Sequence, residues 1–298
     1  MKNHFGKSAT GLLVLILALF VFPVNASAAL REPLPDDGLS IPQERLSLEI
    51  RTVNVAVVLT LHNGEELFIE YLGDEENKLF YSLNDGLLKI FQENENFVVF
   101  NEGSIFNEGG ILNDGWNWTA NGTANERGSL SVFIPVNSRK FNSITINTAS
   151  GAVNIDSFIA ETLRVNSASG SVSASGIVNS GDFRLSTHSG SIDVDAVIAR
   201  NININSVTGS MRLENFKIDD IGIETHSGAI TANVIIACNI SISSVTGSTR
   251  LENSTVNGDL DIETQSGAIN LENVKAEHRL NLNSITGRII VNGQNYNN

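Results

Sequence analysis

A short motif places side chains suited to chemistry at one repeated position of this chain. Ser or Thr, a variable residue, Ser or Thr and Gly follow one another in eight places, and the variable residue is histidine at His188 and His226. Hydroxyls and imidazoles are the groups that nucleophilic catalysis uses, and pairs of histidines also bind zinc. The other copies carry Ala, Val, Gln or Ile there. We therefore expect structural hydroxyls, with His188 and His226 as outward-facing candidate ligand-binding residues.

The two histidines do not predict a metal site. They are two copies of the motif apart, and strands stacked about 4.8 Å apart would separate their Cα atoms by roughly 10 Å. A structural zinc ion takes four ligands, and no third ligand is obvious nearby in the sequence. We expect no metal and no cofactor, because a column of solvated side chains explains the pair.

Acidic residues of the repeat are the other candidates for chemistry, since paired carboxylates cleave glycosidic bonds. They follow the motif glycines at Asp193, Asp195, Glu214, Glu252 and Glu272, and the last three share the context Leu-Glu-Asn. A catalytic pair is expected to interrupt a repeat with unusual residues, whereas these residues are copied with it. The chain also lacks a Ser-His-Asp elbow, a phosphate loop and a metal-binding helix motif. We expect that it is not an enzyme.

Trp116 and Trp118 are the only tryptophans, and they belong to a Gly- and Asn-rich segment between residues 101 and 128. Exposed tryptophan on a polar loop stacks against sugars, which makes both residues candidate ligand-binding residues. The alternative is a loop that folds back and covers a sheet edge. That role is favoured because apolar residues between 105 and 112 crowd the same segment.

The motif marks a long internal repeat. Its glycines follow one another at intervals of 19 or 20 residues. They are Gly151, Gly170, Gly190, Gly209, Gly228, Gly247, Gly267 and Gly287. So constant a period is typical of a solenoid, in which each repeat stacks on its neighbours.

Apolar residues alternate around each glycine, as Ile202 and Ile204 do before Gly209. A period of two predicts strands with these side chains on the inner face. If the alternation continues, both motif hydroxyls also face inward, where hydroxyls of neighbouring coils form ladders. The glycine then shifts the inward–outward alternation by one residue, at a bend whose backbone conformation disfavours a Cβ. A second, looser corner follows about seven residues later. We expect an all-β fold: a single-stranded β-solenoid of about eight rungs of 19–20 residues, with an N-terminal β-rich capping region.

The first residues predict export. Lys2 and Lys7 accompany an apolar run of twelve residues (11–22), and Ala26-Ser27-Ala28 provides the small residues of a cleavage site. A cleaved signal peptide is favoured over a membrane anchor because spanning a bilayer takes roughly 20 residues. We expect a signal peptide (1–28), a linker (29–43), the capping region (44–140), the β-solenoid repeats (141–293) and a tail (294–298). The mature chain is expected to have no transmembrane segment.

Composition narrows the partners. Residues 1–28 contain two lysines and no acidic residue, so the formal charge changes from −14 to −16 on cleavage. So acidic a chain is repelled by nucleic acid and by anionic lipid, and we expect neither as a partner. Cys238 is the only cysteine, so stability depends on burial and hydrogen bonds without an intrachain disulfide.

Three consecutive features resemble a known family: Leu-Ser-Val-Phe-Ile-Pro at 130–135, Phe-Asn-Ser-Ile-Thr-Ile at 141–146, and the Ser-Gly rungs that follow. In these features the chain is similar, over roughly residues 45–292, to the bacterial putative adhesin family of uncharacterised function. Some members of that family are encoded with cell-envelope stress systems. The resemblance implies a bacterial surface or secreted β-solenoid and transfers no catalytic residue.

A secreted or cell-surface binding module of adhesin-like, non-catalytic type fits these patterns best, because regular outward columns offer a long surface for multivalent contacts. Its partner would be a cell-envelope or extracellular protein or glycan. One alternative is an accessory protein of cell-envelope stress sensing. The other is a carbohydrate-active β-helix enzyme, which is less favoured because the constant period leaves no room for inserted loops.

Overall fold

The computed structural model describes residues 32–41, 46–73, 78–92, 128–136, 141–157, 159–179 and 181–296. Within these ranges the chain consists of strands and turns, without a helix. The described strands form one hydrogen-bonded sheet and belong to one compact unit. The expectation of an all-β protein is confirmed.

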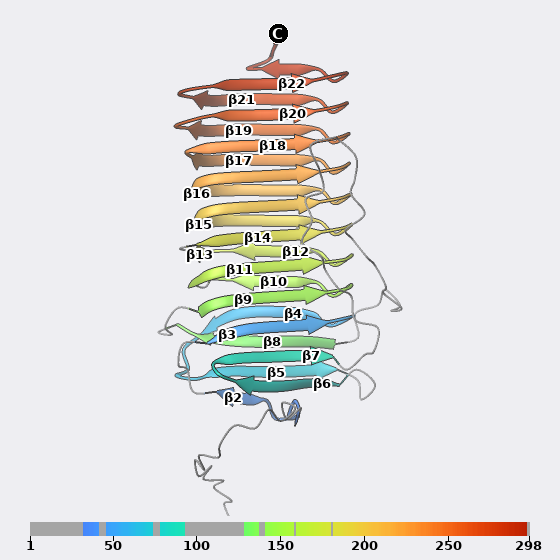
Figure 1. Ribbon diagram of the computed structural model, residues 1–298, viewed down its shortest axis with the longest axis vertical. Coiled ribbons are helices and arrows are strands. Elements are labelled where there is room, and N and C mark those ends of the chain that lie inside the picture. Colours follow the sequence, from blue (N-terminus) through green and yellow to red (C-terminus); the bar gives the residue numbers. More distant parts are fainter. Residues whose placement is uncertain are drawn as a thin grey trace, which may run out of the picture. The chain divides into compact units, whose positions relative to one another are not determined.

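The strands divide into an N-terminal group and a repeat group (Figure 1). The N-terminal group comprises β1 (Glu32–Pro33), β2 (Leu39–Ile41), β3 (Ser47–Thr52), β4 (Ala56–His62), β5 (Leu67–Gly73), β6 (Leu79–Asn84), β7 (Leu87–Gln92) and β8 (Gly128–Pro135). The repeat group begins with β9 (Phe141–Thr148), β10 (Val153–Asp156), β11 (Ile159–Ser167), β12 (Val172–Ser175), β13 (Val178–Asn179), β14 (Asp182–Thr187), β15 (Ile192–Ser206) and β16 (Met211–Thr225). It continues with β17 (Ile230–Ala237), β18 (Asn239–Ser244), β19 (Thr249–Val256), β20 (Leu260–Thr264), β21 (Ile269–Ala276), β22 (Leu280–Ser284), β23 (Ile289–Val291) and β24 (Gln294–Asn295).

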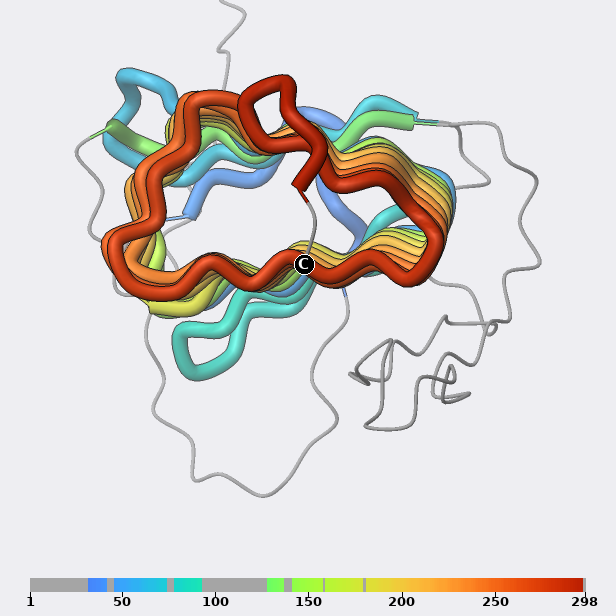
Figure 2. Tube along the Cα trace, turned by 90° about the horizontal axis from the view of Figure 1, so that it is seen from above, coloured from blue at the N-terminus to red at the C-terminus, as the bar shows by residue number. Residues whose placement is uncertain are grey.

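Strands β9 to β23 of the repeat group pair in parallel with strands one repeat away, whereas the short β24 pairs antiparallel with β23. Val165 of β11 lies opposite Leu185 of β14, Leu185 lies opposite Ile204 of β15, and Ile204 lies opposite Ile223 of β16. Each coil therefore hydrogen-bonds to the coils before and after it, and successive coils superimpose around a common interior (Figure 2). The result is a β-solenoid of about seven turns, which confirms the expected fold class.

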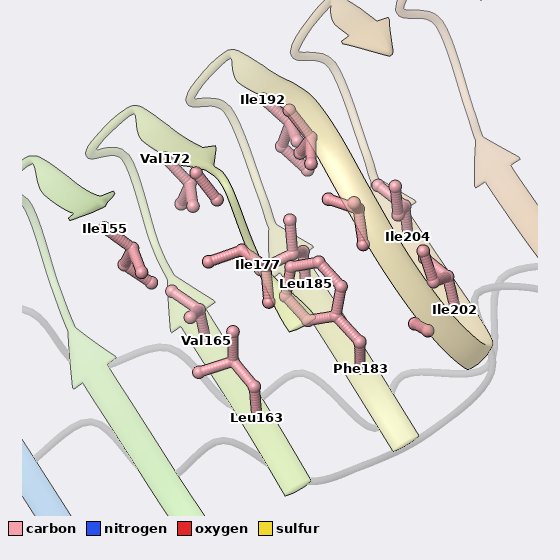
Figure 3. Packing of buried hydrophobic residues seen from close by; sticks show 14 of the residues in the cluster. Ile155, Leu163, Val165, Val172, Ile177, Phe183, Leu185, Ile192, Ile202 and Ile204 are labelled. Atoms are coloured by element: carbon pink, nitrogen blue, oxygen red, sulfur yellow. The ribbon is translucent and has the colours of Figure 1, made fainter. Parts of the chain in front are cut away.

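The interior is filled by the alternating apolar side chains. Leu163, Val165, Phe183 and Leu185 point into it from successive coils and are fully buried (Figure 3). One cluster of buried residues extends along the stack from Leu34 to Ile289. Burying a side chain of this size stabilises the fold by about 1.5–3 kcal/mol, so the sum over the coils supplies the main driving force for stacking.

Glycine is needed at the first corner for a reason that differs from the expected one. None of the motif glycines has a positive φ. Instead, a Cβ on Gly209 would lie 1.8 Å from the carbonyl oxygen of Gly190, and a Cβ on Gly228 would lie 1.9 Å from that of Gly209. The expected conformational reason is wrong: backbone stacked closely on backbone leaves no room for a side chain.

The second corner is where the chain takes the left-handed conformation. One residue of each coil has a φ between 48° and 63° there. These residues are Ser157, Gly176, Ala196, Asn215, Val234, Asn253, Asn273 and Asn292. Asparagine tolerates this region better than most residues, whereas a β-branched side chain such as that of Val234 is an outlier in it.

Replacement of Val234 by asparagine is expected to stabilise the protein by about 1 kcal/mol, because it removes part of the roughly 1–2 kcal/mol cost of the left-handed conformation. Little burial is lost, since Val234 is 38% exposed. Thermal unfolding measures the effect, with Asn215→Val as the reverse change. A Val234→Asn protein that unfolds at or below the wild-type temperature would contradict this account of the corner.

The N-terminal strands continue the stack and then change direction. On the repeat side, β3 pairs in parallel with β9, and β4 pairs in parallel with β10. Further out, β5 pairs antiparallel with β8, and β6 pairs antiparallel with β7. In the range expected to be a linker, β1 and β2 add antiparallel pairs to β6 and β5. The N-terminal region is thus continuous with the repeats through hydrogen bonds.

Candidate functional site

The first hydroxyl of each motif closes the glycine corner. Ser206 is fully buried; its Oγ accepts a hydrogen bond from the Gly209 N–H at 2.9 Å and donates one to the Gly209 carbonyl oxygen at 3.2 Å. The same N–H to Oγ bond recurs at Gly151, Gly190, Gly228, Gly247, Gly267 and Gly287. These hydroxyls therefore bond to backbone groups, and not to one another as the expected ladders require.

The second hydroxyl of the motif faces outward, contrary to expectation. Thr208 is exposed, and its Oγ1 donates to the carbonyl oxygen of His188 in the preceding coil at 3.3 Å; Thr246 bonds His226 in the same way at 3.2 Å. The equivalent bond is made by Ser150, Ser169, Ser189, Ser227, Ser266 and Thr286. Inward alternation ends at the first hydroxyl, two residues earlier than expected, because the chain already turns there.

Loss of the inner hydroxyl is expected to cost more than loss of the outer one. Thr225→Val leaves the Gly228 N–H, now bonded at 3.0 Å, buried without an acceptor, which costs about 1–3 kcal/mol. Thr246→Val removes only an exposed bond and should cost about 0.5 kcal/mol or less. Urea unfolding of both variants measures the difference. Equal destabilisation would show that the inner hydroxyls do not close the corners.

His188 and His226 lie in the same column, separated by Val207. Backbone bonds connect each coil to the next there: Thr208 N–H donates to the His188 carbonyl at 2.9 Å, and Ser227 N–H donates to that of Val207 at 2.9 Å. Both imidazoles are half-buried at the surface of this column. No group of three or more metal-ligating side chains occurs in the described ranges. A ligand-binding role for the two histidines stays a prediction.

Trp116 and Trp118 lie outside the described residues. Their expected roles, in sugar stacking or in covering a sheet edge, therefore stay predictions. The same holds for the signal peptide at residues 1–28.

The repeated carboxylates are held by neighbours at the surface. Glu214 forms an ion pair with Arg212 at 2.9 Å, and Arg250 pairs with both Glu252 and Glu272. Asp195 accepts a hydrogen bond from Asn215 at 2.7 Å. These contacts connect residues of the same coil or of neighbouring coils, as expected of a copied surface ladder.

Glu224 is a carboxylate of the repeat whose surroundings alter its protonation. Partial burial raises the pKa of Glu224 above its ordinary value. Its partners in the two neighbouring coils are Asn205 and Ser243, neither of which is acidic. A glycosidase requires a pair of carboxylates, and Glu224 has no second carboxylate beside it in register.

Aliphatic side chains lie exposed just after the second corner of successive coils. Ile159 lies opposite Val178, which lies opposite Ile198, and their exposed fractions are 46%, 42% and 52%. Lys217 and then Ile236, 47% exposed, continue the same line. We name Ile159, Val178, Ile198 and Ile236 the aliphatic strip. Sequence reasoning missed the strip, although apolar residues recurring at an outward position of the repeat were the signal for it.

A pocket of about 170 Å³ opens at the end of the strip nearest the N-terminal strands. Its lining is mostly aliphatic and includes Leu61, Ile134, Val136, Ile159 and Val178. Val136 is itself 54% exposed. Contiguous exposed apolar surface of this kind marks interaction sites, whereas single exposed apolar residues do not.

Stacked parallel coils and corners closed by hydroxyls and glycines define a β-solenoid repeat protein, with an exposed aliphatic strip along one edge. The chain belongs to the family described as Toastrack DUF4097, which it matches over residues 46–297. This agrees with the expected membership of an uncharacterised β-solenoid family.

One solved structure is similar in fold: a protein of Parabacteroides distasonis ATCC 8503 described as a putative lipid binding protein. The two are 12% identical, with a TM-score of 0.47, and the match covers 87% of this chain and 96% of the other. No curated protein matches the chain significantly. The described residues include no helix long and apolar enough to cross a membrane.

Proposed function

We propose that the protein is an adhesin-like, non-catalytic binding module that is exported to the cell surface or the medium. The aliphatic strip and its pocket are the observation that carries this proposal. Exposed apolar side chains repeated along successive coils cost solubility and contribute little to folding, so a contact with another molecule accounts for them best. The hydroxyls and glycines of the motif support the non-catalytic part, because corner closure already uses them.

The partner is a protein or glycan of the cell envelope or extracellular space. The repeated architecture supports a partner of this kind. Equivalent side chains on neighbouring coils can contact a long partner at several points, and several weak contacts together give high avidity. The net charge of −14 argues against nucleic acid.

Binding of the mature chain (29–298) to an array of wall polymers, matrix proteins and glycans tests the proposal. The informative variant is Ile159→Asn combined with Ile198→Asn, and the control is Ile285→Asn, which changes a 74% exposed side chain outside the strip. Saturable binding lost only in the strip variant supports the proposal. Binding that survives in the strip variant, or no binding to any ligand class, overturns it.

Export is tested separately by N-terminal sequencing of the protein from surface and culture fractions. The expected product begins after Ala28. Uncleaved protein confined to the cytoplasm would exclude a surface role.

A further inference from the structure

We propose that the aliphatic strip binds a basic amphipathic α-helix of a partner protein, laid along the stack of coils. This inference rests on the proposed function and narrows the partner to one chemical class.

The spacing of the strip fits a helix better than an extended chain. Ile159, Val178 and Ile198 are on neighbouring coils, so their spacing is about 4.8 Å along the stack. A helix advances about 5.4 Å per turn, and its residues i, i+4 and i+7 follow one line on its surface. Same-face residues of a strand are about 6.7 Å apart and lose register with the coils at once. An aliphatic stripe on a helix therefore meets successive coils.

The pocket supplies an anchor at one end of that line. Its volume of about 170 Å³ is close to that of a cavity that holds one benzene molecule, about 150 Å³. One side chain of leucine size fits such a space. Ile159 and Val178 belong to both the pocket and the strip, so an anchored residue is continuous with the apolar stripe.

The charged residues beside the strip determine which charge the polar flanks of a bound helix should carry. Asp156 and Asp195 precede the strip, Glu161 follows it, and none of the three forms an ion pair with another described residue. On the following side Arg200 and Asp219 occupy equivalent positions of neighbouring coils, between the register pairs Ala199–Ile218 and Asn201–Asp220, so their formal charges cancel. Asp156, Glu161 and Asp195 thus outnumber Lys217, which lies beside Ile198, so the described charges around the first three strip residues are acidic on balance; this balance attracts Lys and Arg and repels an anionic membrane surface.

Lys217 interrupts the strip between Ile198 and Ile236 without breaking its apolar continuity. A lysine buries its methylene stem along apolar surface and keeps its ammonium group in water. The shortest helix that fits the strip therefore contacts Ile159, Val178 and Ile198, and a longer helix also contacts Ile236.

The experiment measures fluorescence anisotropy of a synthetic peptide of leucine and lysine, about 18 residues long, arranged to form about five helical turns with one apolar face. Two control peptides separate its properties. One has the same composition with leucine and lysine alternating, which favours a strand. The other keeps the helical pattern with glutamate in place of lysine.

Binding to the mature chain is expected to be saturable for the helical leucine–lysine peptide, at least tenfold weaker for both controls, and weaker as salt increases. Ile159→Asn with Ile198→Asn should weaken it at least tenfold, and Glu161→Gln with Asp195→Asn should reduce its salt dependence. Ile285→Asn should leave it unchanged. Circular dichroism and thermal unfolding establish that each variant is folded.

Three results overturn the helix proposal: no binding of the helical peptide, equal binding of the alternating peptide, or binding that the strip variant does not change. The ligand array distinguishes this failure from that of the proposed function. If the array still finds a ligand whose binding depends on Ile159 and Ile198, the binding module stands and its partner is of another class.

Discussion

Replacement of Gly209 by alanine is expected to lower the free energy of unfolding by about 3 kcal/mol or more. The added Cβ would lie 1.8 Å from the carbonyl oxygen of Gly190, a backbone atom that cannot rotate away. The coils must separate locally, which weakens the bonds from Thr208 N–H to the His188 carbonyl and from Ile192 N–H to the Ser210 carbonyl, both 2.9 Å. One methyl group thus disturbs several inter-coil bonds together.

Gly222→Ala is the matched control for this prediction. A Cβ there would approach only Asn203 Oδ1, at 3.0 Å, and that side chain can move. Alanine also restricts the unfolded chain more than glycine does, so the control should remain within about 1 kcal/mol of wild type. Urea unfolding followed by circular dichroism and by intrinsic fluorescence measures both variants. Similar midpoints for the two would refute the close-stacking explanation of the motif glycines.

Replacement of Phe216 by alanine is expected to cost about 3–5 kcal/mol, because it removes a buried ring and leaves a cavity that rigid coils fill poorly. Phe216 is 1% exposed and lies between Val197 and Ile235 of the neighbouring coils. These residues form an apolar column at the second corner. The cavity would remove the packing contacts between this coil and its two neighbours and would destabilise the centre of the stack.

Lys217→Ala tests whether burial causes this loss. Lys217 follows Phe216 in the chain but faces outward and is exposed, so its removal should change stability by about 0.5 kcal/mol or less. Thermal and urea unfolding of both variants measure the effect. A Phe216→Ala protein as stable as the Lys217→Ala protein would contradict the packing of this column.

The amino-acid sequence by itself determined the period, the strands and the inward apolar residues. A solenoid repeats one local solution, so the spacing of glycines and the alternation of residues such as Ile202 and Ile204 report the stacking directly. The motif hydroxyls were also recognisable as structural, because eight copies at one position are more than any catalytic site needs.

Only the tertiary structure decided how neighbouring coils meet. The need for glycine at the first corner comes from the distance between backbones of different coils, which no local pattern specifies. The outward turn of Thr208 likewise depends on the carbonyl group of His188 in the coil before it. The aliphatic strip exists because register places Ile159, Val178 and Ile198 side by side, although 39 positions separate the first from the last. Contacts between distant residues require the register of the folded stack, and the strip is therefore a property of the stack.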